Sequence, residues 1–199
     1  MRFTVNNRYA KKAVLVLGLT VFFHAAALPW LNRCASGPAA LEPVLEVLKE
    51  NKAELGPIDE ERLAEVILVE SDKYKLDPLF VLALIKTESN FSSLSKSLSG
   101  AIGLMQILPF TGRALAEELN LKWMGPETLL DPYTNVRIGI HYISSLTERF
   151  NDINASLAAY NAGPTYFATR MRSGELVAQN YVNRVLDNYR DFKERAEYY

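Results

Sequence analysis

An all-α fold is predicted for this chain, and two features of the sequence support the prediction. Stretches with apolar residues at helical spacing follow one another from residue 41 onward, separated by clusters of Gly, Pro, Asn and Ser. No stretch alternates apolar and polar residues at period two over several strands. The expected helices are 41–55, 58–75, 78–89, 109–120, 132–149, 154–161, 164–172 and 178–193.

The first two expected helices form an extension before the main helical region. In residues 41–55, Val44, Leu45 and Leu48 are spaced for one helix face. Gly56-Pro57 ends this helix, and Ile58-Asp59 begins the second, which runs to about residue 75. The pair is either a stalk or a brace packed on the main domain, and the sequence leaves both open.

The helix expected at 78–89 carries an acid at its carboxyl end. Asp77 is a suitable N-cap and Pro78 suits the first helical position. At helical spacing, Leu84, Ile85 and Glu88 fall on one face. A carboxyl group on a buried face loses solvation, so its pKa should rise toward the range that a general acid needs near neutral pH.

Among the later helices, the one expected at 132–149 has a clear start signal. Asp131 is its expected N-cap, ahead of Pro132, and has no assigned chemistry. His141, within this helix, is interpreted as a packing or surface residue.

Composition indicates one globular domain plus an appendage. Of the 199 residues, 49% are hydrophobic and 23% are charged, as in globular proteins. The first 33 residues hold five basic and no acidic side chains, whereas the remainder is acidic, which argues against nucleic-acid binding. Cys34 is the only cysteine, so no intramolecular disulfide can form. With two histidines in the chain, a multi-histidine metal site is not expected.

The amino terminus has the pattern of an export signal. Residues 1–12 are basic, residues 13–23 are uniformly apolar, and small residues follow up to Ala27. Cleavage near Ala27 is one interpretation. The other, slightly favoured, is an uncleaved inner-membrane anchor over residues 13–31. Lipid attachment at Cys34 is not favoured, because Asn and Arg precede it where small residues are expected.

Four motifs follow in order along the helical region. They read E-S-N-F from residue 88, G-A-I-G-L-M-Q-I-L-P from residue 100, D-P-Y-T-N-V-R-I-G from residue 131 and A-Y-N-A-G-P from residue 159. Together they closely resemble the catalytic domain of the soluble lytic transglycosylase (SLT) family, over about residues 65–193. The resemblance implies a lysozyme-like helical fold, related to goose-type lysozyme. The expected organisation is a signal or anchor at 1–34, a linker and helical extension at 35–64, and an SLT-type domain at 65–199.

The resemblance also implies roles for individual residues. Glu88 matches the family's catalytic acid/base. The implied substrate contacts are Ser97, Gln106, Tyr160, Asn161 and Tyr181. One departure is visible at Leu108, where many members have methionine. Because the two side chains are apolar and similar in volume, altered packing is expected rather than lost activity.

The function that the resemblance implies is cleavage of peptidoglycan without water. Glu88 would act alone as acid and then base at the N-acetylmuramic acid to N-acetylglucosamine β-1,4 bond, leaving 1,6-anhydromuramyl ends. The expected protein is a monomer of the periplasm or cell envelope that binds glycan strands and needs no cofactor or metal. The alternatives are a hydrolytic muramidase on the same fold and a non-catalytic peptidoglycan-binding protein. A secretion accessory that recruits a partner through residues 41–75 is a third.

Overall fold

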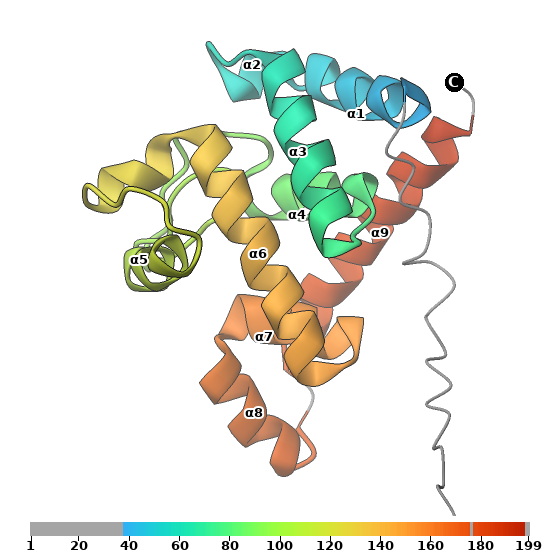
Figure 1. The fold of residues 1–199 in the computed structure, drawn as a ribbon. Helices are drawn as coiled ribbons and strands as arrows, with labels where there is room; N and C mark the ends of the chain where they lie inside the picture. Colours follow the sequence, from blue (N-terminus) through green and yellow to red (C-terminus); the bar gives the residue numbers. More distant parts are fainter. Residues whose placement is uncertain (1–37, 176, 198–199) are drawn as a thin grey trace, which may run out of the picture.

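A computed structural model describes residues 38–175 and 177–197, with side chains from residue 41 onward. In this part of the chain the regular structure is helical, apart from isolated bridges that join Ile102 to Lys96 and to Ile107. Figure 1 shows the arrangement. The elements are α1 Pro38–Glu50, α2 Lys52–Leu55, α3 Glu60–Tyr74, α4 Pro78–Ser89, α5 Pro109–Glu118, the 3₁₀ helix η1 Pro126–Leu130, α6 Pro132–Phe150, α7 Ile153–Ala162, α8 Pro164–Arg172 and α9 Gln179–Ala196.

The core is built around α4. Every residue from Pro78 to Ile85 is buried, so this helix is apolar on all sides until its last turn. It packs most extensively against α9, and it also contacts α1 and α3. Helices α6 and α7 pack on each other, and α8 extends away from the core beside α7 (Figure 1). The all-α prediction is therefore confirmed.

The helix predicted at 41–55 is interrupted in the structure. Helix α1 ends at Glu50, and the short helix α2 begins at Lys52. Between them, the Asn51 side-chain amide donates to the Val47 carbonyl oxygen at 2.7 Å. An asparagine side chain that bonds to the backbone in this way competes with helix continuation. Gly56 ends the segment as predicted, with a φ of 76°.

The amino-terminal extension packs on the rest of the domain. Val44, Leu48 and Leu55 are fully buried in the same core as α4. Arg195 of α9 also pairs with Glu50 at the end of α1. The extension is thus a brace rather than a free stalk within residues 41–75. The division of the chain at residue 64 stays a prediction.

The predictions for the export segment lie outside the described residues. These are the signal or anchor at 1–34, the apolar span at 13–31, cleavage near Ala27 and lipid attachment at Cys34. Of the helices that the structure describes, none is long and apolar enough to cross a membrane.

Candidate active site

Both ends of α4 are fixed, and this positions Glu88 in its last turn. Asp77 is the N-cap, as predicted, and accepts from the Leu79 backbone N–H at 2.8 Å. The same carboxylate accepts from the Tyr189 hydroxyl of α9 at 2.8 Å. At the other end, Asn90 adopts the left-handed conformation of a C-cap, with a φ of 50°. Glu88 is held just before this cap.

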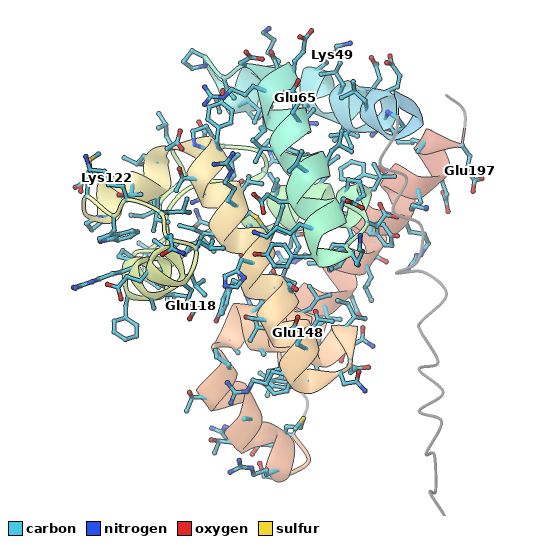
Figure 2. All side chains as sticks on the ribbon, in the orientation of Figure 1. Lys49, Glu65, Glu118, Lys122, Glu148 and Glu197 are labelled. Carbon is cyan, nitrogen blue, oxygen red and sulfur yellow. The ribbon has the colours of Figure 1, made fainter. Side chains whose placement is uncertain are left out.

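The environment of Glu88 favours its protonated form. Burial raises the pKa of Glu88 from 4.5 to about 7, and this effect outweighs two opposing ones. The Tyr181 hydroxyl donates to the Glu88 carboxyl at 2.5 Å, and the positive charge of Arg184 also favours the anion. Many other acids of the chain lie at the surface, although Asp77 is also buried. The charged side chains labelled in Figure 2 are all exposed at the surface: Lys49, Glu65, Glu118, Lys122, Glu148 and Glu197.

Two buried tyrosines lie beside this carboxyl group. Burial and the nearby Glu88 charge raise the pKa values of Tyr160 and Tyr181 well above 10, so both phenols stay protonated donors. The Tyr160 hydroxyl donates to the Met105 carbonyl oxygen at 2.7 Å. Its ring contacts that of Tyr142, with ring centroids 5.0 Å apart. Tyr181 is therefore hydrogen-bonded to the acid itself, whereas Tyr160 is hydrogen-bonded to the loop that contains Met105.

That loop, residues 95–107, carries two of the predicted substrate contacts. The Ser97 hydroxyl accepts from the Ala101 backbone N–H at 3.0 Å, which closes a turn at the exposed end of the loop. Gln106 has a positive φ of 46°, unusual for a residue other than glycine. Its side-chain amide donates to the carbonyl oxygens of Ser95 at 3.1 Å and Gly103 at 2.9 Å. The nitrogen of this amide is thereby turned toward the protein.

A fully buried asparagine of α6 fixes the same loop from behind. Asn135 accepts from the Met105 N–H at 2.8 Å and donates to the carbonyl oxygens of Ile102 at 2.8 Å and Leu129 at 2.9 Å. Gly103 packs against it with a φ of 81°, and a Cβ there would lie 2.3 Å from the Asn135 amide nitrogen. Only glycine fits this position without a shift of the backbone or of Asn135.

The acid, its two tyrosines and part of the 95–107 loop line one cleft. Its volume is about 520 Å³. All six predicted site residues lie on its wall. The lining residues are Thr87, Glu88, Ser97, Ser99, Ala101, Gln106, Ile107, Leu108, Thr111, Tyr142, Tyr160, Asn161, Ala162, Gly163, Pro164, Tyr181 and Arg184.

Sequence reasoning missed three features of this site. Arg184 reaches the cleft one helical turn after Tyr181, a spacing that could have indicated it. Asn135 lies within the motif that begins at residue 131 but was assigned no function from the sequence. Its place among the buried residues of α6 is the signal that could have indicated a structural one. The amide of Asn188 donates to the Thr87 hydroxyl at 2.9 Å, a contact between distant segments for which no local pattern gives a signal.

The charge distribution limits the chemistry that the cleft can perform. Among the described residues that line it, Glu88 is the only carboxylic acid and Arg184 the only basic residue. Within residues 38–175 and 177–197, no group of three or more His, Cys, Asp or Glu is arranged to hold a metal ion. A carboxyl group with a pKa of about 7 can donate a proton near neutral pH and then take one back.

The helical fold, with a groove in which Glu88 is the only acid among the described lining residues, defines a lysozyme-like domain. The chain belongs to the Transglycosylase SLT domain family, whose model matches residues 65–181. The resemblance inferred from the motifs is thereby confirmed.

Two known proteins similar to this chain are lytic transglycosylases by name. A membrane-bound lytic murein transglycosylase E of Buchnera aphidicola is 34% identical over 128 residues, which cover 60% of this chain and 58% of that protein. The soluble lytic murein transglycosylase of Escherichia coli is 39% identical over 87 residues, covering 43% of this chain and 14% of that one. The chain therefore spans less than two thirds of the length of these relatives.

A solved structure shows the same fold. The 70 kDa soluble lytic transglycosylase of Escherichia coli superposes with a TM-score of 0.59 and 27% sequence identity. The match covers 68% of this chain and 25% of that chain.

Proposed function

We propose that the chain is a peptidoglycan lytic transglycosylase. It cleaves the β-1,4 bond between N-acetylmuramic acid and N-acetylglucosamine and leaves 1,6-anhydromuramyl ends, with Glu88 as its single acid/base. One observation carries the proposal: among the described residues that line the cleft, Glu88 is the only carboxylic acid, and its pKa is about 7. Two-carboxylate glycosidases hold their pair roughly 5–10 Å apart across the scissile bond. The names of the relatives support murein as the substrate.

In the first step, protonated Glu88 donates to the glycosidic oxygen. Burial keeps a large fraction of Glu88 protonated near neutral pH. An ordinary surface glutamate is almost fully ionised at that pH. The bond from this oxygen to C1 of the muramyl residue breaks, N-acetylglucosamine leaves with the proton on its C4 hydroxyl, and positive charge develops at C1. Since the described residues of the cleft wall supply no second carboxylate, the 2-acetamido oxygen of the substrate itself stabilises this carbon.

In the second step, ionised Glu88 accepts the proton of the muramyl C6 hydroxyl. The C6 oxygen attacks C1, the internal ether forms, and Glu88 returns to its protonated form. The Tyr181 hydroxyl and the Arg184 charge stabilise the carboxylate in the interval between the two steps. A pKa close to the working pH suits a group that must serve as acid and as base.

The remaining site residues are proposed to hold the sugar. Gln106 has its amide nitrogen bonded to the loop, which leaves its carbonyl oxygen to accept from substrate. Ser97 and Asn161 are exposed at the cleft wall and can reach polar groups of the glycan. Because the Tyr160 hydroxyl is bonded to Met105, the proposed contact of Tyr160 is through its ring.

The proposed location is the cell envelope, with the cleft on the periplasmic side. The membrane-bound name of the Buchnera aphidicola relative supports an envelope location. The proposal includes either anchoring through residues 13–31 or cleavage near Ala27.

Release of soluble muropeptides from purified peptidoglycan tests the proposal. The chain should release them, and Glu88→Gln should lower the rate by about 10²–10⁴-fold, the usual contribution of a general acid/base. Glu148→Gln, an exposed change on α6, is the matched control and should keep full activity. Substantial turnover by Glu88→Gln would show that another group is the acid. Binding to the wall without any release by the wild type would favour a non-catalytic protein.

A further inference from the structure

Arg184 occupies a well-fixed position at the cleft. It lies on α9 one turn after Tyr181, and residues at this spacing share a helix face. Tyr181 donates to Glu88 at 2.5 Å, and Asn188, one turn further along, donates to Thr87 at 2.9 Å. Both acceptors belong to the last turn of α4. The backbone that carries Arg184 is therefore held against α4 on either side.

The Arg184 guanidinium group forms no salt bridge or hydrogen bond with an acid in the described part of the chain, although its charge acts on Glu88. Its side chain is exposed and forms no ion pair there. Asp187, three residues further on α9, pairs instead with Arg190 at 3.1 Å. The Glu88 carboxyl accepts from the Tyr181 hydroxyl rather than from Arg184. The guanidinium donors are thus available to a ligand in the cleft.

A guanidinium group at this place fits a carboxylate, which it can bind with two parallel hydrogen bonds. In peptidoglycan the muramyl residue carries a lactyl group that ends in a carboxyl group, whereas N-acetylglucosamine carries none. Where a stem peptide is attached, the lactyl carboxyl forms an amide and the free carboxylates lie on the peptide. Resting on the function proposed above, we propose that Arg184 binds a carboxylate of the muramyl substituent and so selects muramyl residues at this part of the cleft.

This contact has a consequence for the acid. The Arg184 charge lowers the pKa of Glu88, in opposition to burial. A substrate carboxylate bound to Arg184 offsets that charge and holds more of Glu88 in the protonated form before proton donation. Substrate with the correct substituent thereby favours its own cleavage.

Binding in the Glu88→Gln background tests the proposal. This change should slow cleavage by about 10²–10⁴-fold, so that binding can be measured, and it removes the titration of Glu88 as a route by which Arg184 could act. The 199-residue chain is titrated into three fluorescent ligands, and anisotropy gives each Kd. The ligands are peptide-free glycan strands with free lactyl carboxylates, strands that keep their stem peptides, and N-acetylglucosamine oligomers without any carboxylate.

Arg184→Gln should raise the Kd for a carboxylate-bearing ligand by about fivefold, the order expected of an exposed charge pair, and this effect should shrink as salt is added. Arg184→Lys should retain part of the affinity. The Kd for the N-acetylglucosamine oligomers should not change. Arg172→Gln removes an exposed cation of α8 that does not line the cleft, and it should leave all three Kd values unaltered.

The pattern of loss identifies the source of the carboxylate. If Arg184→Gln weakens binding of the peptide-free strands alone, the bound carboxylate is that of the lactyl group. If it weakens binding of the peptide-bearing strands alone, the bound carboxylate belongs to the stem peptide. Unchanged binding of all three ligands, or an equal loss with the uncharged oligomer, overturns the proposal. If wild type cleaves peptidoglycan in either of those cases, the Arg184 proposal alone fails. If wild type cleaves nothing and the Glu88→Gln chain binds none of the ligands, the proposed function fails with it.

Discussion

Replacing Glu88 with glutamine should stabilise the folded chain at neutral and basic pH. The pKa of Glu88 is about 7 in the folded chain against 4.5 for an ordinary glutamate, so folding strengthens proton binding. The contribution of Glu88 to the unfolding free energy is therefore largest below pH 4.5 and falls as the pH rises to about 7, because the unfolded chain ionises more easily. At about 1.4 kcal/mol for each unit between the two pKa values, the loss amounts to about 3 kcal/mol.

Urea denaturation of the two chains between pH 4 and pH 8 measures this effect. Glutamine still offers a carbonyl oxygen to the Tyr181 hydroxyl, so the contact is kept while the charge is removed. The advantage of Glu88→Gln in unfolding free energy should be about 3 kcal/mol larger at pH 8 than at pH 4. Glu148→Gln provides the comparison for an exposed glutamate of α6.

A difference between Glu88→Gln and wild type that stays constant from pH 4 to pH 8 would refute the reasoning. The carboxyl group would then titrate alike in the folded and unfolded chains, and burial could not be what prepares it as an acid. The same pH-dependent difference in Glu148→Gln would place the effect outside the cleft.

Three further substitutions test the parts of the site separately. Tyr181→Phe removes a hydrogen bond that lowers the pKa of Glu88, so the basic limb of the pH–rate profile should move to higher pH, and an unmoved limb would contradict that role. Asn135→Ala leaves buried backbone groups without partners, including the Met105 N–H, and should cost about 3 kcal/mol of unfolding free energy in urea titrations. Tyr160→Phe removes a buried donor to the Met105 carbonyl oxygen and should lower the unfolding free energy by about 1–2 kcal/mol. Turnover should also fall, because the 95–107 loop is less firmly held. Unchanged stability and turnover would show that this bond does not hold the loop.

Most helices could be predicted because their signals are local. Helix α4 follows from the Asp77 cap, Pro78 and the apolar run after them, and the structure ends it at Ser89 as expected. The break at Asn51 was missed, because the sequence does not show whether an asparagine side chain will bond to its own helix. The 3₁₀ helix at Pro126–Leu130 was also missed, since so short an element has no periodicity to read.

In the candidate site, too, the features with local signals could be predicted, and those that depend on tertiary contacts could not. The burial of Glu88 follows from its position on an apolar helix face, and its raised pKa agrees with that expectation. The contact between Tyr181 and Glu88 joins residues 93 positions apart, so only the family resemblance could suggest that the two lie together. The three bonds of Asn135 and the place of Arg184 at the cleft wall depend on tertiary packing. No local pattern specifies the bonds of Asn135, whereas the spacing of Arg184 after Tyr181 gives only its helix face.

Digestion of purified peptidoglycan in water enriched in heavy oxygen tests the central claim most directly. The claim is that Glu88 alone transfers the proton and that the muramyl C6 hydroxyl, not water, attacks. Mass spectrometry should find 1,6-anhydromuramyl ends without heavy oxygen in the wild-type digest, and about 10²–10⁴-fold slower formation of these ends with Glu88→Gln. Reducing muramyl ends that carry heavy oxygen would contradict the claim and identify a hydrolase on the same fold.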